Sequence, residues 1–412
     1  MELDPERSWP GVAADLDLPR AVRESFTPVL IERLLALRRQ LHRFPELSLE
    51  EEQTARALEA ELALLRPAEL GRVAGTGVIA RIAGRDASAP WVAIRGDIDA
   101  LPIEEATGLP YASEHPGVMH ACGHDVHATW AVGAAALLAA DPPAGDVWVV
   151  LQPAEELALG AKAVLASGRL EGVQAIFGGH VDRRFEVGQV VVQEGPLAAS
   201  VDSFELELVG EGAHAARPHE ARDPLLGAAQ LVLALESVAP RRVAPGHPAV
   251  LTVASLQAGS ADNVIPGRAL LRGTLRATDA ATRALLREEL GHLTEHVAAA
   301  HRLRWELRFT VETPPLRNEG VAVGWTRAAA EALLGAAAVV PLGLVNMGGE
   351  DFAFYLEQLP GCFFRVGARE RGGPVVAAHS PRFHAADEAI LVGAALLAGA
   401  ARVASNGLSA KR

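Results

Sequence analysis

The sequence is poor in several kinds of residue, and each shortage excludes a class of protein. Cysteine occurs twice among 412 residues, too rarely for the disulfide framework of a small secreted domain. Lysine occurs only as Lys162 and Lys411, and acidic residues outnumber basic ones by 51 to 38, which gives a formal net charge of −13. That charge disfavours nucleic acid or an anionic membrane surface as the main partner.

Long apolar runs are also missing. The two longest, at 128–140 and 389–401, are rich in alanine and glycine and shorter than the roughly 20 residues that a membrane span needs. The first residues do not combine a basic start with an apolar stretch, as a signal peptide would. We therefore expect a cytoplasmic chain in which both runs are buried helices and the first two dozen residues form a loose leader.

The chain does contain enough apolar sequence for a large core, since 50% of its residues are hydrophobic and 22% are charged. Its length indicates two or three domains at roughly 100–200 residues each. Short apolar strands at 91–95, 147–151 and 175–177 alternate with helical patterns at 126–140 and 161–167. This alternation predicts a mostly parallel sheet covered by helices.

The middle of the chain has a different pattern of apolar and polar residues. Residues alternate with period two at 203–209 and 304–311, which indicates half-exposed strands, and two further strands lie between two helical patterns. The order β-α-β-β-α-β is typical of a ferredoxin-like domain. We predict an inserted domain at 197–312 between the two parts of a catalytic domain, 28–196 and 313–405.

Candidate catalytic side chains follow the ends of the three predicted parallel strands. Asp97 and Asp99 follow the first strand, Glu155 and Glu156 follow the second, and His180 follows the third. Sites in open α/β sheets form at the carboxyl ends of the strands. Taken singly, the acidic pairs could be turn caps or solvated loop residues, and the histidine an ordinary core residue. Their joint placement favours a functional site.

A dense set of metal-ligating side chains lies between the first two of these strands. The segment 119–127, MHACGHDVH, places a thiol, several imidazoles and a carboxylate within nine residues. Such side chains bind zinc, nickel, cobalt or manganese. Gly123 lets the backbone bend so that Cys122 and His124 can face one point. Cys362 has no such neighbours and is expected to be a small buried side chain.

Several further segments stand out along residues 28–402, in order along the chain. Besides 119–127, they are LHRFPELS (41–48), RGDIDALPI (95–103), QPAEE (152–156), GAHAARPH (212–219), ADNVIP (261–266), GTLR (273–276), GGEDFAFY (348–355) and HSPRFH (379–384). Together these segments resemble one family, the amidohydrolase branch of the dinuclear-metal aminoacylase/carboxypeptidase superfamily. This branch includes hippurate hydrolases, N-acyl-amino-acid deacetylases and auxin-conjugate hydrolases.

The resemblance implies a zinc-peptidase-like α/β fold, in which a mixed sheet is flanked by helices. The inserted ferredoxin-like α+β domain would act as a lid and as the dimerisation surface of a homodimer. The resemblance also implies two divalent metal ions per chain, of which zinc, manganese, nickel and cobalt all suit the donors. Their ligands would be Cys122, His124, Glu156, His180 and His384.

The resemblance further assigns roles around these ligands. Glu155 would be the general base. Asp99 would contact the metal ligands without binding the metal itself. His214 would stabilise the oxyanion, in the active site of its own or of a neighbouring subunit. Asn263 and Arg276 would hold the substrate's free carboxylate. These roles predict the hydrolysis of N-acyl-L-amino acids to a carboxylic acid and a free amino acid.

Three other functions remain open at the level of sequence. A metallo-carboxypeptidase or dipeptidase of the same superfamily would use the same metal ligands. A cysteine hydrolase with Cys122 as nucleophile is a second alternative, and a non-catalytic metal-binding module is a third. The density of histidine and glutamate, with Glu155 beside Glu156, counts against the last two.

Overall fold

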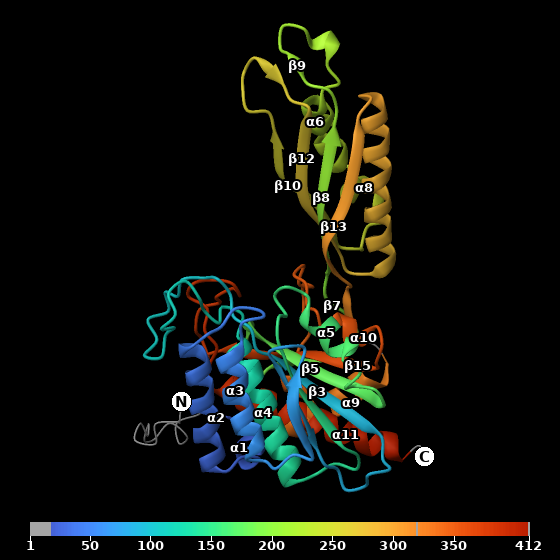
Figure 1. Ribbon diagram of the computed structural model, residues 1–412. Helices are drawn as coiled ribbons and strands as arrows, with labels where there is room; N and C mark the ends of the chain where they lie inside the picture. The colour runs from blue at the N-terminus through green and yellow to red at the C-terminus, as the bar shows by residue number, and fades with distance from the viewer. Residues whose placement is uncertain (1–17, 319, 411–412) are drawn as a thin grey trace. The chain divides into compact units, whose positions relative to one another are not determined.

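The computed structural model describes residues 18–318 and 320–410 (Figure 1). The chain folds into two compact units. Unit 1 takes in the described residues up to Gly195, then Asn318–Leu342 and those from Tyr355 onward, whereas unit 2 takes in Pro196–Arg317 and Gly343–Phe354. The expected leader lies outside the described residues over 1–17, and its later part forms the short helix α1 (Arg20–Glu24).

Unit 1 is built on a seven-stranded mixed sheet with the order β1-β2-β4-β3-β5-β15-β6. The central strands β4, β3, β5 and β15 run parallel, while the outer strands pair antiparallel. The apolar stretches around 91–95, 147–151 and 175–177 become three adjacent strands of the parallel core. The strands are β1 (Glu69–Val73), β2 (Gly77–Ile82), β3 (Trp91–Asp97), β4 (Val147–Gln152), β5 (Val173–Glu186), β6 (Val190–Val191) and β15 (Gly361–Arg369).

Two largely buried helices, α4 (His124–Ala140) and α11 (Glu388–Ser409), pack on this sheet and on each other. Helix α2 packs against α4, and α9 packs against α11. A Thr27 cap, whose Oγ1 accepts the Leu30 N–H at 3.2 Å, and Pro28 at the first position start α2. The remaining elements are α2 (Pro28–Arg43), α3 (Glu52–Ala63), α5 (Gly160–Ala166), α9 (Val321–Leu334), the 3-10 turn η3 (Ala336–Ala338) and α10 (Ala353–Leu356).

Helices α4 and α11 approach closely because glycines lie at their contact. A Cβ atom at Gly393 of α11 would lie 2.1 Å from the Trp130 ring of α4, closer than any real contact. A Cβ atom at Gly133 of α4 would lie 3.0 Å from Ala394. The apolar run of α11 passes a length and hydropathy test for membrane spans, but 78% of that window is buried inside the protein. Both apolar runs of the sequence are thus core helices.

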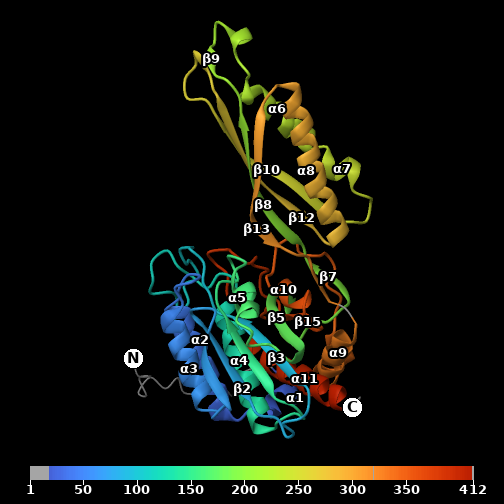
Figure 2. The ribbon, with the colours of Figure 1, turned by 45° about the vertical axis from the view of Figure 1, so that its right-hand side comes forward.

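Unit 2 contains a four-stranded antiparallel sheet, β10-β12-β8-β13, with α6 and α8 packed on it (Figure 2). Its main elements follow the order β-α-β-β-α-β. Asp279 caps α8 by accepting the Thr282 N–H at 2.8 Å. The elements are β8 (Ser200–Val209), β9 (Ala213–His214), η2 (Pro218–Glu220), α6 (Pro224–Leu235), α7 (Val238–Arg242), β10 (Ala249–Ala258), β11 (Val264–Ile265), β12 (Arg268–Ala277), α8 (Ala280–Ala300) and β13 (Arg304–Thr313).

The chain leaves unit 1 through β7 (Gly195–Ala198) and returns through β14 (Leu316–Asn318), and these two strands pair with each other. A mixed sheet flanked by helices, together with a second α+β unit, confirms the predicted fold class. The expectation of a mostly parallel sheet holds for its centre, because the hairpin β1-β2 and the short β6 add antiparallel strands at the edges.

Candidate metal centre

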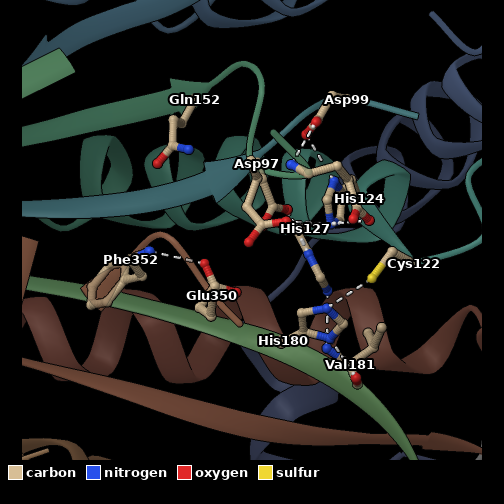
Figure 3. Close-up of polar contacts among 12 residues, drawn as sticks. Asp97, Asp99, Cys122, His124, His127, Gln152, His180, Val181, Glu350 and Phe352 are labelled. Atoms are coloured by element: carbon tan, nitrogen blue, oxygen red, sulfur yellow. Dashed lines mark hydrogen bonds and ion pairs between the residues drawn. The ribbon is translucent and has the colours of Figure 1, made fainter. Parts of the chain in front are cut away.

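The parallel strands of unit 1 bring polar side chains to one level of the sheet. Asp97 is paired in register with Gln152 of β4, and Arg365 of β15 with His180 of β5. Ile94 of β3 is paired in register with Phe177 of β5, and Asp97 and His180 each lie three residues further along these two strands. The ends of β3 and β4 therefore lie near His180 at the carboxyl end of the parallel core, and Figure 3 shows Asp97 on the same side of the sheet as His124, Cys122 and His180.

A tight bend at the start of α4 presents two of the predicted ligands. Gly123 has a φ of 87°, a left-handed conformation that glycine adopts without strain. A Cβ atom there would lie 2.5 Å from Val181 Cγ2, so the bend also lies directly against β5. Cys122 precedes the bend and His124 follows it. The Cys122 Sγ atom lies 3.3 Å from His180 Nε2.

Hydrogen bonds fix which ring nitrogen of each histidine faces the centre. His124 donates its Nδ1–H to Asp99 Oδ1 at 3.0 Å, and His180 donates its Nδ1–H to the Val181 carbonyl at 2.7 Å. Each ring therefore directs Nε2 toward the centre (Figure 3). Metal-binding histidines use this arrangement, with the other nitrogen bound to a carboxylate or a carbonyl.

The surroundings of His124 fit a cation. Its Nε2 atom is buried and has no hydrogen-bond partner among the described residues. Oxygens of Asp97, Glu155 and Glu156 lie 3.8, 3.9 and 3.9 Å away, too far for hydrogen bonds. A ring nitrogen without a hydrogen-bond partner and the carboxylate oxygens around it together form a donor set that suits a divalent ion. The donor atoms of Cys122, His124 and His180 also lie within 4.8 Å of one another.

The electrostatics agree with this fit. Burial opposes a charge on His124, but Asp97 and the hydrogen bond to Asp99 raise its pKa well above the ordinary value. The site thus stabilises positive charge. Burial, together with Glu156, raises the pKa of the Cys122 thiol to about 12.

The two glutamates lie on a strained loop after β4. Ala154 has a φ of 51°, a conformation that non-glycine residues rarely adopt, and its N–H donates to Glu51 Oε1 at 2.9 Å. Glu156 donates its main-chain N–H to Asp99 Oδ2 at 3.0 Å. The side chains of Glu155 and Glu156 are 11% and 13% exposed. Asp99 therefore supports His124 and Glu156 at once.

The third histidine of the helix start, His127, has a different place. Its Nδ1–H donates to Asp97 Oδ1 at 2.6 Å, and its Nε2 accepts the Val181 N–H at 2.9 Å. Its ring also stacks on Trp130, with 4.5 Å between the ring centroids. Because both of its ring nitrogens make hydrogen bonds, His127 anchors the β5 main chain next to His180 and does not face an ion.

The structure does not bring His384, a predicted ligand, to this cluster. Its Nε2 lies 3.1 Å from Glu370 Oε1, and among the described residues it belongs to none of the donor groups. His379, five residues earlier, takes that place instead. Its Nε2 lies 3.3 Å from Glu156 Oε1, and the donor atoms of Cys122, Glu156 and His379 lie within 4.8 Å of one another. Both histidines belong to the segment 379–384, and sequence spacing alone could not choose between them.

The predicted residues of unit 2 fall into two places. The Ala215 N–H donates to the carbonyl of Asn263 at 2.9 Å, and β9 pairs with β11, so His214 and Asn263 are neighbours. Arg276 lies near the far end of β12 and donates from Nη1 to the Met347 carbonyl at 2.6 Å. Strand β12 has ten residues, a length of roughly 30 Å. The structure thus separates Arg276 from the other two.

The sequence indicates Asp97 as a strand-end carboxylate, two residues before Asp99, but not that it faces His124. It also does not single out His379 within the segment 379–384. The pairing of Asp97 with His127 could not be read from the sequence, because it depends on the packing of α4 against β3.

Comparisons with known proteins agree with the geometry. A family model described as Peptidase family M20/M25/M40 matches residues 93–403. An N-acetyl-L-cysteine deacetylase of Bacillus subtilis is 42% identical over 87% of this chain and 86% of its own length. The IAA-amino acid hydrolase ILR1-like 4 of Arabidopsis thaliana is 36% identical over 88% of this chain and 83% of its own length.

Solved structures give the same relationship. The YxeP protein of Bacillus subtilis, described as a dinuclear metal-binding peptidase of the M20 family, aligns with a TM-score of 0.81. It is 36% identical in sequence, and the alignment covers 92% of this chain and 99% of YxeP. The fold, the clustered donors and these matches lead to one assignment. The chain belongs to peptidase family M20/M25/M40.

Proposed function

We propose that this chain is a metal-dependent amidohydrolase that cleaves the amide bond of N-acyl-L-amino acids. The observation that carries the proposal is the buried His124 Nε2, which lacks a hydrogen-bond partner among the described residues and faces three carboxylates beside the Cys122–His180 pair. The names of the relatives support the substrate class, because they describe deacetylation of N-acetylcysteine and hydrolysis of IAA-amino acids.

The proposed cofactor is a pair of divalent metal ions. Bound ions would supply the Lewis acidity that activates water and polarises an amide carbonyl. The donor chemistry, one thiol with imidazoles and carboxylates, suits zinc, manganese, nickel or cobalt. The proposed donors are Cys122, His124, Glu156, His180 and, in place of His384, His379.

Glu155 is the proposed general base. It follows the strained Ala154 and lies next to the donor Glu156, and its Oε2 lies 3.9 Å from His124 Nε2. A carboxylate there can take a proton from the attacking water and pass it to the leaving amine. Asp99 keeps the His124 ring and the Glu156 main chain in place and does not touch the substrate.

The second unit contributes the proposed substrate contacts. Arg276 is the candidate for the free carboxylate, because a guanidinium binds a carboxylate with two parallel hydrogen bonds. His214 is the candidate for the oxyanion, with Asn263 beside it. One small substrate cannot touch both ends of a strand roughly 30 Å long. We therefore propose a homodimer with two active sites. Arg276 of each chain would bind substrate in one site, and His214 and Asn263 of the same chain would contribute to the other.

The homodimer would form through the inserted domain, 197–312, and the enzyme would act in the cytoplasm on small molecules. The net charge of −13 supports small-molecule substrates over nucleic acid or anionic membranes. The family also contains peptidases, as the description of YxeP indicates, so dipeptides are the second candidate substrates.

A panel of substrates tests the proposal. Purified protein should carry about two divalent ions per chain, and chelation should abolish turnover of N-acetyl, N-benzoyl and N-indoleacetyl amino acids until metal is restored. Dipeptides should be cleaved more slowly than the best N-acyl amino acid. Activity that survives chelation but is lost on thiol alkylation would favour the cysteine-hydrolase alternative. Protein that binds metal but cleaves none of the panel would favour a non-catalytic module.

A further inference from the structure

The segment that follows β15, residues 370–387, carries His379 to the candidate metal centre. The His379 N–H donates to the Ala121 carbonyl at 2.8 Å, directly beside Cys122, and the Ala106 N–H donates to the Pro381 carbonyl at 2.7 Å. The side chain of His379 is 53% exposed, so packing around the ring contributes little to its position. The position of this donor therefore depends on what holds the segment.

The backbone of His379 needs such support. Its φ of 66° lies in the left-handed region, which L-residues other than glycine adopt only at a cost in free energy. Conformations of this kind persist where the surroundings determine them, and they concentrate at functional sites.

Arg183 donates hydrogen bonds to several parts of this segment. It lies on β5, three residues after His180, and its side chain is 1% exposed. Its Nη2 donates to Glu370 Oε2 at 2.9 Å and to the Pro374 carbonyl at 3.0 Å. Its Nη1 donates to the His384 carbonyl at 2.8 Å and, more weakly, to Ala368 at 3.3 Å and to Glu370 Oε1 at 3.4 Å. One buried guanidinium thus joins residues on both sides of His379.

Glu370 and His384 complete the arrangement. His384 Nε2 lies 3.1 Å from Glu370 Oε1, so the carboxylate bridges Arg183 and His384. Burial opposes ionisation of Glu370, but hydrogen bonds from His384 and Arg183 hold its pKa at about 2. The carboxylate is therefore charged at neutral pH, and its bonds to Arg183 are of the strong, charge-assisted kind.

We propose that Arg183, Glu370 and His384 form a clamp that positions His379 for metal binding. The three are positioning residues, since they act through the backbone of the segment and not on the substrate. This inference rests on the proposed function in one respect, the assignment of His379 as a metal donor. It also gives His384 a structural role in place of the ligand role predicted from sequence.

Two measurements test the clamp without using activity. The first is the metal dissociation constant, obtained by competition with a chromogenic chelator. The second is trypsin cleavage of the metal-free protein at Arg371 and Arg382, both inside the segment, with mass spectrometry to locate the cuts. Glu370→Gln and His384→Ala are the main variants, because Arg183→Met removes a buried charge and could prevent folding.

Both main variants should weaken metal binding by about 10–100-fold, the usual effect of losing a partner that orients a ligand. Cleavage at Arg382 should accelerate roughly tenfold or more, because proteolysis follows the population of the open segment. His384→Gln, whose amide can donate to Glu370, should restore most of both properties. Arg184→Met is the matched control, since Arg184 pairs with Asp182 at the surface, and it should behave like wild type.

His379→Ala separates the clamp from its alternatives. It should lose one bound ion outright, whereas His384→Ala should keep both at saturating metal. Loss of an ion in His384→Ala but not in His379→Ala would overturn the clamp and return the ligand role to His384. Unchanged affinity and unchanged cleavage in Glu370→Gln and His384→Ala would also overturn it. A wild-type protein that binds no metal would instead overturn the proposed function, whatever the cleavage rates.

Discussion

Replacing Asp99 by asparagine should weaken metal binding while leaving every proposed donor atom in the chain. Asp99 is 1% exposed and accepts three hydrogen bonds, from His124 Nδ1 at 3.0 Å, the Glu156 N–H at 3.0 Å and Ser48 Oγ at 2.7 Å. An asparagine has one carbonyl oxygen for these three donors. Whichever way the amide turns, an N–H group then faces either His124 or the Glu156 N–H.

The size of the effect follows from those contacts. A hydrogen bond to a charged group contributes about 1.5–3 kcal/mol, so losing one reduces a binding constant by about 10–150-fold. Ser48→Ala is the matched control, because it removes one donor and leaves the Asp99 charge and the other two bonds. We expect it to cost less than about tenfold.

Chelator competition on the purified variants gives the metal dissociation constants, and turnover at saturating metal gives kcat. Asp99→Asn should recover much of its kcat when metal is in excess, because its defect lies in binding. If Asp99→Asn binds metal as tightly as wild type, the carboxylate does not orient His124 and Glu156, and the reasoning fails.

Three further predictions concern other residues. Glu155→Gln should keep fold and metal content but lose about 10²–10⁴-fold in kcat, measured with the best N-acyl amino acid, and a near-normal kcat would place the base elsewhere. Wild type should prefer substrates with a free carboxylate over their methyl amides by at least about tenfold in kcat/KM. Arg276→Ala should abolish that preference. Equal cleavage of both substrates by wild type would exclude the carboxylate contact. The folded-state pKa of Glu370 is lowered from 4.5 to about 2, so its stabilising contribution is complete above about pH 4.5 and is lost as pH falls toward 2. Urea unfolding should therefore find Glu370→Gln less stable than wild type at pH 7, with the difference shrinking below pH 4.5, and a difference that grows toward low pH would contradict this sign.

Much of the fold could be predicted from local patterns. Buried parallel strands are continuous apolar runs, and half-exposed strands alternate, so β3, β4, β8 and β12 were all visible in the sequence. The full length of β5, Val173–Glu186, was not, because its polar half is paired with β15 far along the chain. Pairings of this kind depend on tertiary structure and leave no local signal.

The candidate site was predictable to a similar depth. Cys122 and His124 lie in one short segment at the start of α4, and Glu156 follows the end of β4, so local order already brings these donors together. The choice between His379 and His384 depends on how a long segment is held against β5, and neither spacing nor residue type reveals that. The separation of Arg276 from His214 was equally hidden, since it follows from the register of β12.

The close contact of Gly393 with Trp130 has a consequence for protein engineering. Replacing helix glycines by alanine commonly stabilises a protein by up to about 1 kcal/mol, so Gly393, in the interior of α11, looks like a suitable site. A methyl group there would instead displace the Trp130 ring, on which His127 stacks. His127 in turn accepts the main-chain N–H of Val181, next to His180. Stabilisation screens that score helix propensity alone would therefore select a substitution that disturbs the packing behind His180, a proposed metal donor.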